Sequence, residues 1–330
     1  MSAKVPGGGM PVTALVPAPA QSSARLPSAD VGSNDRRRRR QSRLGRAAAW
    51  AVMILLMLVT LFPFYWMLRT SLSTNGALAA NSSNLLPAEF SVNGWKRVFG
   101  LATPEEALAD GGSGASLNFW IYLRNSLVVA TVTTVVQTFF SALAAYAFAR
   151  LRWPGRDAVF FLFLTALMVP PIFTILPNFI LIRDLGLLNT YLGIVLPGLL
   201  MAPFSVFFLR QFFLGIPREL EEAAKLDGAG YPRVFFRIIV PMSVAPISTL
   251  AILTYIGSWN DYFWPLLVGK AENVRVLTVA LGVFRSQTPQ GSPDWAGLMA
   301  ATFVSAVPIL ILFAVLGRRV INSIGFTGLK

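Results

Sequence analysis

Long apolar stretches alternate with polar and charged stretches along most of the chain. Six of the apolar stretches approach or exceed the roughly 20 residues that a helix needs to cross the hydrocarbon core of a bilayer. Because that core holds no water, a spanning segment must satisfy its backbone hydrogen bonds internally, as a helix does. We therefore predict an all-α polytopic membrane protein with six transmembrane helices. The predicted spans are residues 47–68, 119–149, 157–177, 191–213, 242–263 and 295–316.

Prolines are expected to break or kink the third and fourth predicted spans. Pro170 and Pro171 are expected to break or end the third span near the outer surface, because proline removes a backbone donor and clashes with the preceding turn. Pro197 and Pro203 are expected to kink the fourth span in the same way.

A long polar interruption, residues 214–241, separates the fourth and fifth spans. Pro217 suits the first position of a helix, and Asp227–Gly228 marks its end, because glycine readily adopts the left-handed conformation found after helix C-termini. A second short helix is expected to follow, with an apolar face made of Val234, Phe235, Ile238 and Ile239. Isolated helices need roughly 12–15 residues to persist in water, so both helices must lie against another surface.

The composition excludes an ordinary soluble domain. Of the 330 residues, 55% are hydrophobic and 13% are charged, and the mean hydropathy is +0.60. The chain has no cysteine and no histidine, which excludes disulfides, Cys-ligated metals and the commonest general base. It also lacks a Walker A sequence, so any ATP must bind another chain. We expect no catalytic residue, metal or cofactor here.

The basic residues distinguish the two sides of the predicted membrane protein. With six spans, both terminal segments, the loop after residue 149 and residues 214–241 share one side. All of the formal net charge of +13 lies on this side, and the loops on the other side are balanced. Since cytoplasmic loops carry the excess of Lys and Arg, both termini and residues 214–241 are predicted to be cytoplasmic.

Residues 1–46 are predicted to form a disordered, basic cytoplasmic tail ahead of a transmembrane domain at residues 47–330. The first part is rich in Ala, Pro, Gly and Ser, a composition that cannot bury enough apolar surface to fold. Arg36–Arg40 form an unbroken basic run. Such a run can contact nucleic acid, but beside a membrane span an anchor to anionic lipid is the better interpretation. No nucleic-acid partner is expected.

The polar interruption also carries a recognisable motif. Glu222-Ala223-Ala224 is followed by Gly228 after three residues and by Ile238-Ile239-Val240-Pro241 after nine more. This resembles the EAA motif of ABC importer permeases, with Val240 in place of the usual Leu. The resemblance implies a type I importer permease fold in which cytoplasmic coupling helices between spans 4 and 5 dock on an ATPase subunit. The residues implied for coupling are Glu222, Ala223, Ala224, Asp227 and Gly228.

Further segments resemble the maltose-type carbohydrate branch of this family over about residues 47–330. They are Asn125-Ser126, residues 144–150, Pro154-Gly155-Arg156, residues 185–190 and residues 259–263. The resemblance implies sugar import by alternating access in a bacterial-type cytoplasmic (inner) membrane. The implied partners are two ATPase subunits that bind ATP-Mg, a second homologous permease that forms a heterodimer with this chain, and an extracytoplasmic solute-binding protein. Glycerol phosphate or another polyol is the alternative solute.

A solute path is expected near the outer end of the fifth span. Trp259, Asn260, Asp261 and Tyr262 combine aromatic faces with hydrogen-bonding groups, and sugars are commonly held by both. The alternative interpretation is an aromatic belt at the membrane interface with a polar helix end.

Two other classes of function fit less well. An ion-coupled secondary transporter usually keeps ionisable residues inside the bilayer, whereas the predicted spans are nearly free of them. A membrane-embedded enzyme needs an acid–base cluster, and no suitable pair of carboxylates lies on one face of the membrane. We therefore expect a transport subunit and not an enzyme.

Overall fold

The computed structural model describes residues 31–80, 83–111, 117–286 and 293–325. Every regular element in these ranges is a helix, apart from one isolated antiparallel bridge between Ser73 and Phe90. The chain divides into two compact units, Met1–Thr60 and Leu61–Lys330. Helix α1, Val31–Ser71, begins within the segment that we expected to be a disordered tail. Residues 1–30 of that segment lie outside the described residues.

The second unit contains the remaining helices. They are α2 (Asn75–Ala80), α3 (Asn93–Val98), α4 (Pro104–Ala109), α5 (Phe119–Arg150), α6 (Arg156–Thr165), η1 (Ala166–Met168), α7 (Pro171–Asp184), α8 (Tyr191–Val195), η2 (Leu196–Gly198), α9 (Pro203–Leu214), α10 (Arg218–Leu226), α11 (Tyr231–Val234), the π-helix η3 (Phe235–Ile239), α12 (Val240–Met242), α13 (Val244–Asn260), α14 (Phe263–Val268), α15 (Leu277–Ser286) and α16 (Trp295–Gly325).

Three helical segments in the described ranges are long and apolar enough to span a membrane: Gly45–Ser71, Phe119–Arg150 and Trp295–Val315. Up to three more spans result if bent helix pairs are each counted as one. The first such pair, α6–η1 with α7, bends by 99° where Pro170 and Pro171 interrupt the helix. The second, α8–η2 with α9, bends by 49° between Pro197 and Pro203. Both breaks fall where the prolines predict them.

The third bent pair joins the polar interruption to the fifth predicted span. Tyr231–Met242 meets Val244–Asn260 at 80°, so the bend separates the loop helices from the apolar helix α13. The predicted start of this span at residue 242 therefore lies at the bend.

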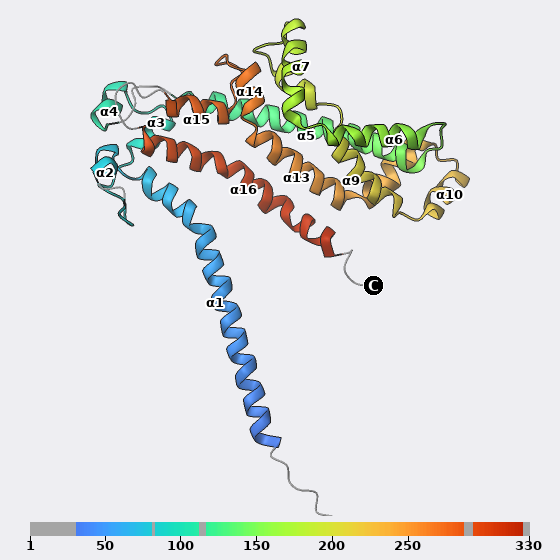
Figure 1. The fold of residues 1–330 in the computed structure, drawn as a ribbon, viewed down its shortest axis with the longest axis horizontal. Helices are drawn as coiled ribbons and strands as arrows, with labels where there is room; N and C mark the ends of the chain where they lie inside the picture. The colour runs from blue at the N-terminus through green and yellow to red at the C-terminus, as the bar shows by residue number, and fades with distance from the viewer. Residues whose placement is uncertain (1–30, 81–82, 112–116, 287–292, 326–330) are drawn as a thin grey trace, which may run out of the picture. The chain divides into compact units, whose positions relative to one another are not determined.

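Helix α5 is the centre of the packing. It contacts α9 and α13, and α13 in turn contacts α16 (Figure 1). The inner part of α5 buries Ala142, Ala145 and Ala149 against α9 and the η3 segment. Small residues let helices approach closely, which drives helix association in lipid. Helices α3 and α4 lie at one end of this bundle and α10 lies at the other.

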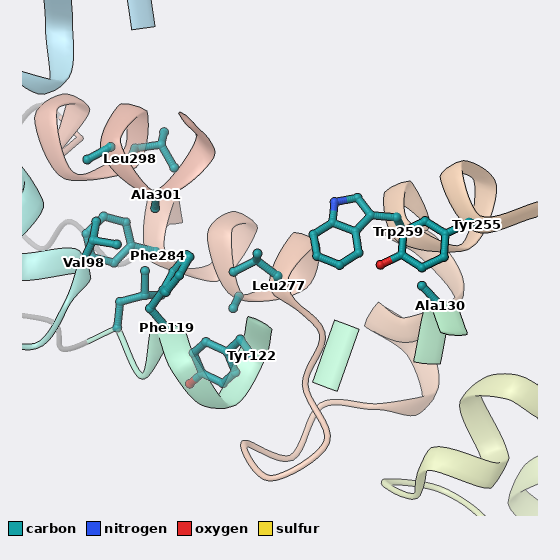
Figure 2. Packing of buried hydrophobic residues seen from close by; sticks show 13 residues of the cluster. Val98, Phe119, Tyr122, Ala130, Tyr255, Trp259, Leu277, Phe284, Leu298 and Ala301 are labelled. Carbon is teal, nitrogen blue, oxygen red and sulfur yellow. The ribbon is translucent and has the colours of Figure 1, made fainter. Parts of the chain in front are cut away.

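A second apolar cluster lies towards the end of the bundle that carries α3. Figure 2 shows Phe119, Phe284 and Leu298 packed together, with Trp259 against Tyr255 at the other side of the cluster. The Tyr255 and Trp259 rings are stacked, with centroids 5.9 Å apart and planes 14° apart. The segments that follow α13 thus return to pack on the outer part of α5.

Two residues that open the second predicted span tie these segments together. The Asn125 amide donates to the backbone carbonyls of Asn273 and Arg275 at 3.0 and 2.9 Å. The Ser126 hydroxyl accepts the backbone N–H of Leu277 at 2.7 Å, which begins α15. Asn125 and Ser126 therefore join α5 to the chain after α14 through hydrogen bonds.

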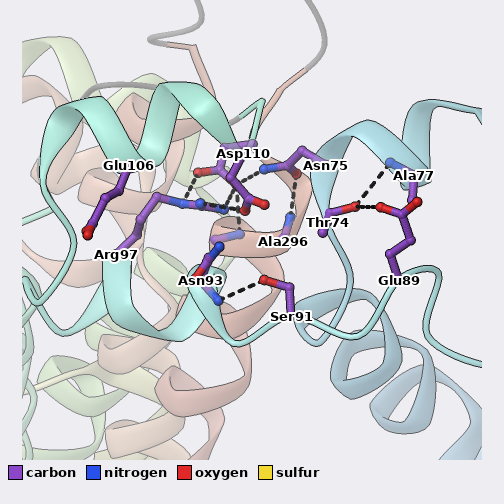
Figure 3. A network of polar contacts seen from close by, with 12 residues as sticks. Thr74, Asn75, Ala77, Glu89, Ser91, Asn93, Arg97, Glu106, Asp110 and Ala296 are labelled. Atoms are coloured by element: carbon purple, nitrogen blue, oxygen red, sulfur yellow. Dashed lines mark hydrogen bonds and ion pairs between the residues drawn. The ribbon is translucent and has the colours of Figure 1, made fainter.

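A buried polar network holds the same end of the bundle (Figure 3). Arg97 forms ion pairs with Asp110 at 3.0 Å and with Asp294 at 2.7 Å. Asn75 donates to Asp294 at 2.8 Å and accepts the backbone N–H of Ala296 at 3.1 Å. The Asp294 side chain is fully buried, so its charge depends on Arg97 and Asn75 for compensation.

We expect Arg97→Met to lower the free energy of unfolding by about 3–5 kcal/mol, because it leaves the Asp294 carboxylate buried without its cation. Thermal unfolding of the detergent-purified protein measures the effect. Lys96→Met is the matched control, since Lys96 is exposed and a change of about 0.5 kcal/mol or less is expected there. Equal melting temperatures for the two variants would contradict this role of Arg97.

Candidate functional site

Helix α10, Arg218–Leu226, has five charged residues among its nine and carries the motif residues. It begins at Arg218 directly after Pro217, one position later than the sequence predicts, and its C-terminal cap is Asp227. Gly228 follows with φ of +79°, and a Cβ there would meet no atom within 4 Å. Glycine is therefore required for its left-handed backbone and not for a close contact. The predicted stop signal is confirmed.

One buried ion pair attaches α10 to the bundle. Glu221 is the only residue of α10 that is buried, and its Oε1 lies 3.1 Å from Nε of Arg150. Arg150 is the last residue of α5. Its guanidinium also donates to the backbone carbonyls of Phe213 and Ile216, which lead into α10. A single side chain thus fixes α10 and the chain before it to the end of α5.

Most residues implied for coupling are free to contact a partner. Glu222, Ala223, Asp227 and Gly228 are exposed, and Ala224 is partly buried against the inner apolar cluster. Leu226, which sequence reasoning did not select, has 90% of its surface exposed. Carboxylates next to an exposed aliphatic side chain are suited to docking on another protein.

The chain after Gly228 folds back onto the bundle. Val234, Phe235 and Ile239 are buried and Ile238 is partly buried, so the predicted apolar face is confirmed. Residues Phe235–Ile239 form a single π-helical turn, a geometry that often marks functional sites. Arg233 is exposed.

An open cavity of about 570 Å³ also lies between α5, α7, α8–η2, α13 and the start of α14. Its polar lining consists of Thr133, Gln137, Thr174, Asn178, Thr254, Ser258 and Asp261. Within the described part of the chain, the amides of Gln137 and Asn178 make no hydrogen bond to protein. Both side chains are half-buried, so they offer donors and acceptors to an occupant of the cavity.

Of the four residues predicted for the solute path, only Asp261 lines this cavity. Its carboxylate faces backbone N–H groups of residues 262–264, at the start of α14. Trp259 is buried in the outer apolar cluster, and the Asn260 amide donates to the Ile256 carbonyl of its own helix at 2.8 Å. Tyr262 lies against Gly282, where a Cβ would come within 2.8 Å of the ring. The four side chains therefore do not face one common site.

Sequence reasoning missed Gln137, Asn178, Ser258 and Glu221. Gln137 and Ser258 are polar side chains inside apolar spans, and that pattern is itself a signal. Asn178 lies one residue beyond the predicted end of the third span, whereas the structure includes it in α7. Glu221 and Glu222 are adjacent, so they point in different directions on a helix, and only packing shows which one is buried. In the described ranges no three acidic side chains group to hold a metal ion.

We expect Arg150→Met to lower the free energy of unfolding by about 3–5 kcal/mol, because Glu221 stays buried without a cation. The double variant Arg150→Met/Glu221→Leu should recover part of this loss, since no buried charge remains. Thermal unfolding in detergent measures both, and Glu222→Leu is the exposed control. A double variant no more stable than the single one would contradict the ion pair as the attachment.

Residues 137–324 match the family described as "Binding-protein-dependent transport system inner membrane component". The chain is 32% identical to the probable ABC transporter permease protein YurM of Bacillus subtilis, covering 88% of this chain and 91% of that protein. It is 36% identical to the arabinooligosaccharides transport system permease protein AraQ of Halalkalibacterium halodurans, over 64% of this chain and 75% of that protein. It is 30% identical to the sn-glycerol-3-phosphate transport system permease protein UgpE of Salmonella typhi, over 83% of this chain and 93% of that protein.

The fold is similar to a crystal structure of a bacterial ABC transporter involved in the import of the acidic polysaccharide alginate. The TM-score is 0.70 at 22% sequence identity, over 84% of this chain and 97% of the matched chain. The chain therefore belongs to the binding-protein-dependent inner membrane components, as a multi-pass permease subunit of an ABC importer that works with a substrate-binding protein and with a separate ATPase subunit.

Proposed function

We propose that this permease imports an uncharged sugar and transmits ATPase movement through α10. The observation that carries the proposal is the position of α10: its motif residues are exposed, while Glu221 fixes it to Arg150 at the end of α5. A docking helix held in this way passes on a displacement to the longest helix of the bundle. The printed names of relatives such as AraQ support a sugar as the solute.

The proposed topology has six spans with both termini in the cytoplasm. The bent pairs α6–η1 with α7 and α8–η2 with α9 then count as one crossing each, and α13 alone forms the fifth. The net charge of +13 supports this orientation, since the basic loops share the side of α10. Helices α3 and α4 at the other end of the bundle then face outward, where a solute-binding protein docks.

The proposed assembly contains two ATPase subunits and a second, homologous permease as a heterodimer partner. Glu222, Ala223, Ala224, Asp227 and Gly228 form the contact with one ATPase, together with Leu226. Switching a two-state transporter from 1:99 to 99:1 requires about 5.5 kcal/mol. A rigid helix transmits such a bias better than a flexible loop, and the buried Arg150–Glu221 pair supplies this rigidity.

The cavity favours a neutral solute over glycerol phosphate, which the match to UgpE suggests as the second candidate. Its lining holds hydroxyl and amide groups and one carboxylate, Asp261, but no Lys or Arg. A phosphate needs cationic or backbone N–H partners to replace its water. A sugar hydroxyl instead is suited to the Gln137 and Asn178 amides.

Glu222→Arg should remove the ATPase subunit when the tagged chain is purified from membranes in mild detergent, because it reverses a charge on the docking face. Leu226→Ser should weaken the same association. Glu105→Arg is the matched control, since Glu105 is also exposed but lies in α4 at the other end of the bundle. Recovery of the ATPase at wild-type levels with Glu222→Arg would exclude α10 as the docking element.

Gln137→Leu and Asn178→Leu should each raise the KM for sugar uptake about tenfold, because each removes a hydrogen bond worth about 1 kcal/mol or more. Uptake is measured in proteoliposomes of the assembled importer with radiolabelled neutral oligosaccharides and with glycerol 3-phosphate. Asn260→Leu is the control, because its amide bonds to its own helix. Uptake of glycerol 3-phosphate with no uptake of neutral sugars would overturn the proposed solute class.

A further inference from the structure

A second cavity, of about 430 Å³, lies at the α10 end of the bundle. It is lined by the connection between α5 and α6, the first turn of α6 and the first residue of α10. The lining residues are Arg152, Trp153, Gly155, Arg156, Asp157, Ala158 and Arg218. Three of the seven are arginines and one is an aspartate, so cationic side chains predominate in the lining.

Only one of the three arginines has its charge compensated within the described part of the chain. The Arg156 guanidinium donates to both carboxylate oxygens of Asp157, at 2.9 and 3.2 Å. Arg210, from α9, also approaches Asp157 at 4.0 Å. Arg152 and Arg218 are exposed and form no ion pair there. Two uncompensated cations therefore remain at the cavity.

The helix termini at the cavity add to the positive potential. Helix α6 begins at Arg156 after Gly155, and α10 begins at Arg218 after Pro217; neither has a side-chain cap. The backbone N–H groups of a first helical turn carry a partial positive charge that favours an anion. Asp157 in the first turn of α6 and Glu219 and Glu221 in the first turn of α10 complement part of this potential, whereas Arg218 adds to it.

The surroundings of the cavity are apolar, which indicates the kind of anion. Helix α6 continues from the cavity with exposed side chains: Val159, Phe161 and Leu162 expose 45%, 70% and 69% of their surfaces. In the proposed third span these side chains face lipid. Trp153, which lines the cavity, is a residue typical of the membrane interface. A site for an anion beside an apolar helix surface suits an amphiphile, whose anionic head group and apolar chains can occupy the two regions.

We propose that this cavity binds the phosphate group of an anionic phospholipid of the cytoplasmic leaflet. The phosphate lies between Arg152 and Arg218, near the start of α6, and the acyl chains lie along Val159, Phe161 and Leu162. A lipid in this position links the α5–α6 connection to the first residue of the docking helix. Free phosphate shares the head-group chemistry but lacks the apolar part. The proposal rests on the proposed orientation of α6 and does not depend on the solute.

Native mass spectrometry of the assembled importer tests the site. The complex is purified in mild detergent through the tagged chain and titrated with phosphatidylglycerol or with phosphatidylcholine. We expect wild type to bind phosphatidylglycerol at least about tenfold more tightly than phosphatidylcholine. Arg152→Gln/Arg218→Gln should lose this preference. Arg233→Gln/Arg237→Gln, which removes two exposed arginines outside the cavity, should keep it.

Two further measurements, on the single variants and with inorganic phosphate, distinguish a lipid site from the alternatives. The single variants Arg152→Gln and Arg218→Gln should each lose several-fold of the preference, and they replace the double variant if it fails to assemble. Inorganic phosphate at millimolar concentration should not displace the lipid. Displacement by phosphate would identify a free-anion site, and an unchanged lipid preference in the cavity variants would exclude the cavity; either result overturns the proposal. Loss of sugar uptake alone leaves this binding measurement intact, so the two proposals fail separately.

Discussion

A charged pair buried beside the α5 terminus fixes the α10 end of this permease. Arg150 and Glu221 expose 3% and 7% of their side chains, and neither charge is tolerated there without the other. The same guanidinium binds two carbonyls of the chain that enters α10. The short helix is therefore positioned by electrostatics and hydrogen bonding in addition to apolar contact. An isolated helix of its length would be marginal.

Hydropathy and proline positions predicted most of the fold. The apolar runs indicated α5, α16 and the Gly45–Ser71 part of α1, because the bilayer demands a continuous apolar helix of a fixed length. Pro170 and Pro171 predicted the sharpest break correctly, since the missing N–H is a local property of the residue. Gly228 predicted the end of α10 for an equally local reason. Features set by the residue itself were readable from the sequence.

Features set by packing were not readable in the same way. Glu221 and Glu222 are chemically identical, and only contact with Arg150 makes one an anchor and leaves the other exposed. Trp259 looked suited to a sugar, but the returning outer segments bury it in an apolar cluster, whereas Tyr262 stays exposed beside Gly282. The cavity instead combines residues from four parts of the chain. Such a combination depends on the helix crossings, which a single sequence does not specify.

The network around Asp294 also constrains the order in which the chain matures. Asn75 and Arg97 are 219 and 197 residues away from Asp294 along the chain. Both are synthesised long before their partner, and chains emerge at about 5–20 residues per second. The Arg97 side chain can therefore pair with Asp294 only after the chain has been synthesised as far as the start of α16. A chain cut short before Asp294 lacks the partner of Arg97 and Asn75, so this end of the bundle stays open.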